Sequence, residues 1–131
     1  MSHLSVCKTK IQNPNKELLK RALEDIARKI GATLRENTTV YGWSGSEHVD
    51  FLLQKNGKGG ANGFGIKVTP NGIEVIGDEW AFNYKIKLDE LSREIEQRYT
   101  MYAIMTAAAE LGLNISGMTE TQEGIVLELT R

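Results

Sequence analysis

Cysteine and histidine are scarce in this 131-residue chain, which contains only Cys7, His3 and His48. A single thiol allows neither an internal disulfide nor a cysteine cage for zinc. Cys7 stands in a strand-like stretch, where packing is a commoner role for a free cysteine than reactivity. No serine, histidine and aspartate set has the sequence of a nucleophile elbow. Hydrolase chemistry of that kind is therefore not indicated.

A charge excess and a long apolar run are also missing. Sixteen Lys and Arg residues face seventeen Asp and Glu residues, so the net charge is −1 and the chain has no long-range field for collecting DNA or an anionic membrane. No stretch approaches the ~20 apolar residues of a membrane span, and the start lacks the pattern of a secretory signal. We therefore expect a cytoplasmic protein without membrane association, folded as one domain over residues 1–131.

The first half of the sequence alternates between strand and helix signals. Residues 3–11 are predicted to be a strand, followed by a helix that Asn13 caps, with Pro14 in its first position and Gly31 at its end. Further strands are predicted at residues 38–43, 48–54, 64–68 and 73–77.

The second half is dominated by one helix, predicted over residues 87–113 and followed by strands at 114–119 and 125–130. These elements predict an α+β fold with a mainly antiparallel sheet and two helices packed on one face, ferredoxin-like in outline, in the order β-α-β-β-β-β-α-β-β. The second half of the long helix is apolar on nearly every side. It must be covered either by the chain's own core or by a partner.

The stretch QKNGKGGANGFGIKV, residues 54–68, holds five of the thirteen glycines. A phosphate-binding loop would need a hydroxyl residue after Gly57-Lys58 and a helix after the glycines, but Gly59 and an alternating strand stand there instead. A loop that connects two strands is the favoured interpretation.

The cluster Glu47, His48 and Asp50 suggests a metal site at first sight. In a strand, however, only His48 and Asp50 share a face, and two ligands do not make a site. We therefore predict no metal and no cofactor. An enzyme would have to depend on His3, His48, Asp50, Asp78 and Arg98, none of which has a partner that the sequence places within hydrogen-bond reach.

Several stretches together resemble one family, the cyanobacterial and plastid-encoded proteins called Ycf thirty-five, grouped as domain of unknown function 1257, with archaeal, bacterial and phage relatives. The resemblance covers nearly the whole chain except residues 32–46 and 55–62. It rests on Met1-Ser2-His3-Leu4-Ser5, Lys8-Thr9-Lys10-Ile11, Ala22-Leu23-Glu24-Asp25, Gly63-Phe64, Gly72, Glu74, Asp78, Trp80, Gln97-Arg98-Tyr99, Tyr102 and Gly112-Leu113-Asn114-Ile115. The family has no established activity, but its members are often encoded near a AAA-type ATPase, which implies an accessory subunit or adaptor.

The first hypothesis is accordingly a non-enzymatic binding module for a protein partner, for which a AAA-type ATPase is one candidate and a second copy of the chain another. Aromatic and methionine side chains supply much of the energy at such contacts. The candidate residues are Trp80, Arg98, Met101, Tyr102 and Met105.

The alternative hypothesis is a single-stranded nucleic-acid-binding protein, which the near-zero net charge disfavours. Bases would stack on aromatic residues of an open sheet face, and lysines would meet the phosphates. The candidates are Tyr41, Trp43, Phe51 and Phe64 for stacking, and Lys55, Lys58 and Lys67 for phosphate. A small enzyme is the third and least supported hypothesis.

Overall fold

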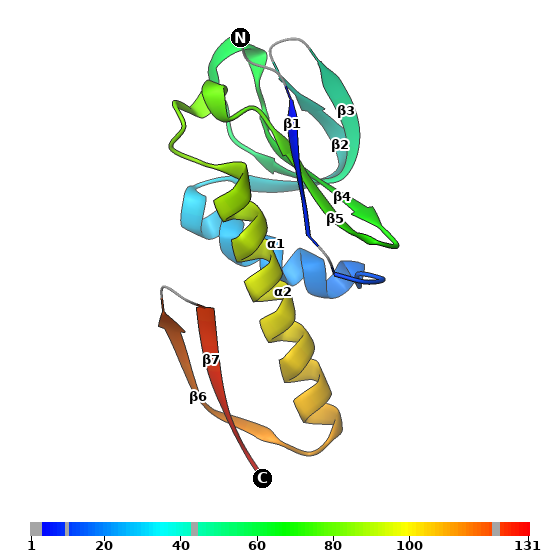
Figure 1. Ribbon diagram of the computed structural model, residues 1–131, viewed down its shortest axis with the longest axis vertical. Coiled ribbons are helices and arrows are strands. Elements are labelled where there is room, and N and C mark those ends of the chain that lie inside the picture. Colours follow the sequence, from blue (N-terminus) through cyan, green and yellow to red (C-terminus); the bar gives the residue numbers. More distant parts are fainter. Residues whose placement is uncertain (1–3, 10, 43–44, 122–123) are drawn as a thin grey trace.

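Five antiparallel strands form the main sheet of the computed structural model, which describes residues 4–9, 11–42, 45–121 and 124–131 (Figure 1). Their spatial order is β1-β5-β4-β3-β2, so each strand after β2 pairs with the one before it and β1 adds at the far edge. The strands of this sheet are β1 (Ser5–Lys8), β2 (Thr33–Tyr41), β3 (Ser46–Gln54), β4 (Gly63–Thr69) and β5 (Gly72–Gly77).

Two helices pack against one face of this sheet, α1 (Lys16–Ile30) and α2 (Leu88–Glu110). Their apolar stripes meet the inward side chains of the strands in the main core, where Leu19, Leu23, Phe64 and Ile95 are completely buried. The predicted α+β class, the two helices on one face and the order of elements are confirmed.

The beginning of α1 differs from the prediction. The cap is Asn15, whose Oδ1 accepts hydrogen bonds from the backbone N–H groups of Glu17 and Leu18. Asn13 instead has a φ of 44°, and Pro14 lies before the helix. Two asparagines flank Pro14, and either could cap a helix by its chemistry. The choice is fixed by tertiary structure, because the Tyr99 hydroxyl of α2 accepts a hydrogen bond from the Asn15 N–H.

The opposite face of the sheet has a smaller core of its own, made of Val40, Val49, Leu52 and Ile76. Each is buried although neither α1 nor α2 packs on this side in the described part of the chain, because β2 and β3 curl over β4 (Figure 1). The curl brings Val40 and Val49 against the backbone of Gly65, where a Cβ atom would meet both side chains.

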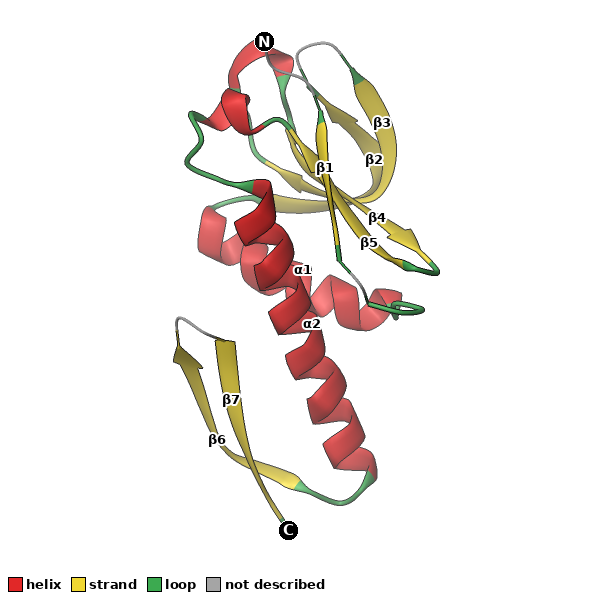
Figure 2. Ribbon diagram, in the orientation of Figure 1, coloured by secondary structure: helices red, strands yellow, loops and turns green. Residues whose placement is uncertain are grey.

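The closing hairpin does not join the main sheet. Strands β6 (Asn114–Thr121) and β7 (Gly124–Thr130) form a separate two-stranded sheet that lies along α2, apart from the five-stranded sheet (Figure 2). In the part of the chain that the structure describes, neither helix combines the length and the apolar character that a bilayer crossing requires.

The glycine-rich stretch connects β3 to β4, as the sequence predicts. It contains one 3-10 turn, η1 (Lys58–Gly60), which lies against a second, η2 (Glu79–Phe82), that follows β5. Gly57 sits so close to Phe82 and Ala81 of η2 that a Cβ atom there would be crowded.

Candidate functional site

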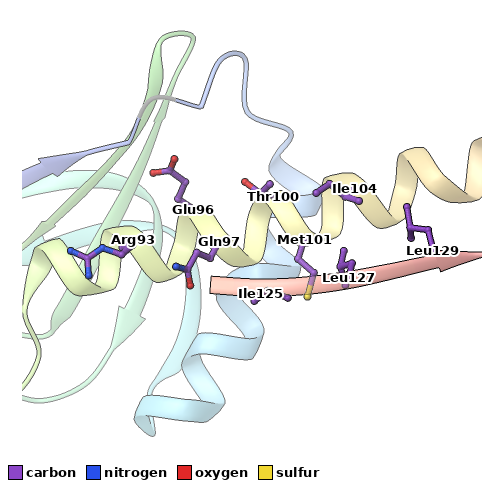
Figure 3. Close-up of a pocket in the computed structure, with 9 residues that line it drawn as sticks. All are labelled: Arg93, Glu96, Gln97, Thr100, Met101, Ile104, Ile125, Leu127 and Leu129. Carbon is purple, nitrogen blue, oxygen red and sulfur yellow. The ribbon is translucent and has the colours of Figure 1, made fainter. Parts of the chain in front are cut away.

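A groove lies between α2 and strand β7, with a volume of about 500 Å³ (Figure 3). Apolar side chains from both elements form its middle, and polar ones stand between Arg93 and Thr100 of α2. The lining residues are Arg93, Glu96, Gln97, Thr100, Met101 and Ile104 of α2, and Ile125, Leu127 and Leu129 of β7.

The alternation of side chains along β7 explains why this strand is apolar on the side toward α2. Residues that face each other across an antiparallel pair point to the same side of the sheet, and Leu127 pairs with Met118 while Ile125 pairs with Glu120. Alternate residues of β7 therefore form an apolar face toward α2, whereas Val126 points away. This face is incompletely covered: Leu129 remains 41% exposed and Met118 53% exposed.

An ion-pair network fixes the turn end of the hairpin to both helices. The Arg98 guanidinium bonds Glu120 of β6 at 2.7 Å and lies 3.7 Å from Asp25 of α1. Asp25 also accepts hydrogen bonds from the Tyr102 hydroxyl and from Arg28. The side chains of Arg98 and Asp25 are only 17% and 16% exposed, so water screens their interaction weakly. The hydrogen bond to Asp25, aided by burial, raises the pKa of Tyr102.

The predicted partner-binding residues are not one cluster. Met101 is the only one of the five that lines the groove. Arg98 and Tyr102 belong to the network between the helices, Met105 is half-buried outside the groove lining, and Trp80 lies on η2. Sequence reasoning missed Ile104 and the three β7 residues of the groove, although the apolar second half of α2 pointed to this region.

The predicted base-stacking surface is wrong for two of its members. Phe64 is completely buried and Phe51 is 3% exposed, because both point into the core beneath the helices, where no base can reach them. Tyr41 is half exposed, and Trp43 lies outside the described residues. Lys67 bonds Glu47 at 3.0 Å, and this hydrogen bond raises the pKa of Lys67.

The remaining two lysines of that prediction, Lys55 and Lys58, lie together at a second, smaller cavity between η1 and η2. The Lys55 Nζ donates to the carbonyl oxygen of Ile30 at 3.0 Å, which satisfies a carbonyl at the end of α1. The Lys58 Nζ donates to Asn83 Oδ1 at 2.7 Å. These lysines therefore lie in the glycine-rich connection, whereas the nucleic-acid hypothesis predicts them on a sheet face.

The two acidic residues of β3, Glu47 and Asp50, each accept a hydrogen bond from a lysine side chain. Burial opposes ionisation of Asp50, but hydrogen bonds from the Val68 N–H at 2.7 Å and from Lys16 at 3.2 Å hold its pKa below the ordinary value. Within the described ranges, no three His, Cys, Asp or Glu side chains are placed to hold a metal ion. Of the other enzyme candidates, Asp78 and Arg98 bond other residues on separate elements, and His3 lies outside the described residues.

Asp78 caps η2 at a cost. Its Oδ1 accepts a hydrogen bond from the Trp80 N–H at 3.1 Å, while its buried Oδ2 has no hydrogen-bond partner among the described residues. Asparagine caps as well as aspartate and carries no charge, so Asp78→Asn should keep the cap and remove a buried, half-satisfied carboxylate.

We expect Asp78→Asn to raise the free energy of unfolding at neutral pH by about 1 kcal/mol, measured by urea denaturation followed by circular dichroism. Asp78→Ala is the matched variant, because it removes the charge and the cap together. A loss of stability in the asparagine variant would show that the carboxylate charge is used by the fold.

Comparison with known proteins gives a family and nothing more specific. The chain matches no curated protein and no solved structure. The family model described as protein of unknown function (DUF1257) matches residues 22–128, which include the larger, C-terminal part of α1, the four strands from β2 to β5, α2, β6 and most of β7. Because the match spans well over half of the sequence, the chain belongs to the DUF1257 family.

Proposed function

We propose that this protein is a non-enzymatic binding module that holds an extended segment of a protein partner in the groove between α2 and β7. The observation that carries the proposal is the one-sided lining of the groove: β7 contributes Ile125, Leu127 and Leu129, and β6 contributes none of the lining residues. The groove therefore runs beside β7, whose second edge, like that of β6, has no neighbour in the sheet among the described strands.

A third strand added along β7 would stabilise the two-stranded sheet and would pair the free edge of β7. A two-stranded sheet is marginally stable in water, and a third strand along β7 would pair its free N–H and C=O groups. Alternate side chains of that strand would then point into the space between β7 and α2. Apolar side chains would fit best, because Met101, Ile104 and Leu127 form the middle of the groove.

The partner's identity is a separate part of the proposal. The resemblance to proteins encoded near a AAA-type ATPase makes such an ATPase our first candidate, with this chain as its accessory subunit or adaptor. A second copy of the chain is the competing occupant, and sedimentation of the purified protein distinguishes the two. If the groove is kept for an ATPase and not for a second copy, the purified chain should sediment as a monomer.

The test compares two variants of β7, one with a lysine on the face toward the groove and one with a lysine on the opposite face. Leu129→Lys puts a charge on the groove face, and we expect it to reduce recovery of the co-purified ATPase about tenfold, since a lysine there would lose water when an apolar strand covers it. Recovery is measured by quantitative mass spectrometry after capture of the tagged chain from its own cells.

Val126→Lys is the matched control, because it makes the same change in the same strand on the face that points away from α2. Both positions are partly exposed, so either lysine can reach water in the free protein, and circular dichroism checks that both variants fold. Equal recovery with the two variants would contradict the groove as the binding site.

A further inference from the structure

The cavity between η1 and η2 is lined by positively charged side chains. It has a volume of about 280 Å³, and three lysines stand around it: Lys55, Lys58 and Lys85. Among its described lining residues there is no carboxylate. The floor is apolar, formed by Ala81, Phe82 and Ile86, and the side chains of Asn56 and Asn83 add polar groups at the rim.

Elsewhere on the described surface, lysine and arginine are mostly paired with acids. Ion pairs are formed by Lys8, Lys16, Lys20, Lys29, Lys67, Arg28 and Arg98. The three cavity lysines form no ion pair with a described carboxylate: Lys55 and Lys58 bond only neutral oxygens. The Lys55 ammonium is turned toward the C-terminal end of α1, whereas Lys58 and Lys85 have no carboxylate partner among the described residues, and two unpaired lysines beside one small cavity favour an anion.

Two exposed aromatic rings stand on η2 and the turn after it, the segment that also supplies Lys85 to the cavity. Trp80 and Tyr84 are 53% and 54% exposed and contact each other edge to face, with ring centroids 5.5 Å apart. Neither ring is needed to fill the core. Asn83 and Tyr84 both have left-handed backbone conformations, with φ of 56° and 58°, and this turn brings Lys85 back to the cavity.

We propose that this cavity binds the phosphate of a nucleotide, with the base against Trp80 or Tyr84. Lysine ammonium groups act as point charges with several donors each, which suits a phosphoryl group with three acceptor oxygens. Recognition of a planar carboxylate would favour the forked donors of arginine instead, and no arginine lines the cavity. Aromatic side chains beside a basic site are the usual platform for a base.

The small number of free lysines limits the length of the ligand. Three lysines neutralise few phosphates, so a free nucleotide or a short stretch of a single strand fits, and a long duplex does not. The two sources share the same chemistry at the cavity. They are distinguished by affinity, because a strand gains from each further phosphate that it places near Lys87, which adjoins this segment in the sequence.

The test uses the whole chain labelled with ¹⁵N and titrated at low salt with AMP, adenosine, inorganic phosphate and a short single-stranded oligonucleotide. We expect AMP to shift the amide signals of Gly57 and Lys85 and the indole signal of Trp80, and to bind more tightly than phosphate or adenosine. Tighter binding of the oligonucleotide would identify a strand as the source, and equal binding a free nucleotide.

Single lysine replacements provide the control. Lys58→Gln and Lys85→Gln should each weaken AMP binding roughly five-fold, the value of a partly exposed ion pair. Lys20→Gln removes the same charge from a lysine paired with Glu36 and should leave binding unchanged. Leu129→Lys should also leave it unchanged, so failure of the groove and failure of this site are separable.

Three outcomes would overturn the nucleotide site. The first is that AMP leaves the signals of the cavity residues unmoved at low salt. The second is that inorganic phosphate binds as tightly as AMP, which would deny a role to the aromatic rings. The third is that Lys20→Gln weakens binding as much as Lys58→Gln, which would show a general charge effect.

Discussion

Gly63→Ala should lower the free energy of unfolding by at least about 3 kcal/mol, a large part of the stability of a small domain. Gly63 begins β4 opposite Gln54, with a φ of 136° that side-chain-bearing residues rarely adopt. A Cβ atom there would overlap the carbonyl oxygen of Leu53 on the neighbouring strand. Neither the strand pairing nor the backbone angle can be kept, so the start of β4 must shift. Urea denaturation followed by circular dichroism measures the loss.

Gly60→Ala separates backbone conformation from crowding. Gly60 also has a positive φ, 80°, but a Cβ atom there would have nothing within 4 Å. We expect a cost of about 1 kcal/mol, that of a left-handed conformation alone. If the two variants were equally stable, close packing at Gly63 would not be the reason for its glycine.

Asp25→Ala should cost about 3 kcal/mol, because it removes the acceptor on which three side chains converge. The Arg98 guanidinium would keep only Glu120, the more exposed of its two carboxylates, and the half-buried Tyr102 hydroxyl would lose its hydrogen bond. Breaking a buried pair on one side costs more than the pair contributes, since the remaining group stays desolvated. Thermal and urea unfolding both report the change.

Glu24→Ala is the matched control for this network. Glu24 is the adjacent acid on α1, and it is exposed, so its loss should change stability by less than about 0.5 kcal/mol. Tyr102→Phe combined with Asp25→Ala should cost less than the sum of the single changes, because the two share one hydrogen bond. Additive losses would contradict the network.

The order of the elements could be predicted from sequence because its signals are local. The spacing of Leu19, Leu23 and Ile26 predicts α1, and the alternation of residues 64–68 predicts β4. The cap of α1 could not be predicted from local rules, since Asn13 and Asn15 are equivalent in type. Contact of Asn15 with Tyr99, far along the chain, decides between them.

The candidate site was less predictable because it is made by distant parts of the chain. The apolar second half of α2 pointed to an uncovered surface, but only the position of the hairpin selects Met101 and Ile104 rather than Met105 for the groove. The alternation of β4 likewise does not say which face is covered, and for that reason the sequence alone allows Phe64 on a stacking surface. Lys58 and Trp80 are brought to one region by the contact of η1 with η2, which no local pattern reveals.

The length of α2 sets how far apart two ligands would be held. The helix begins at Leu88, just after the lysine cavity, and reaches the apolar middle of the groove by Ile104, so sixteen residues at 1.5 Å each separate the two by about 24 Å. Because proline is absent from this helix, that spacing is rigid. A nucleotide at one end and a partner strand at the other would share a fixed geometry, with α2 as the spacer.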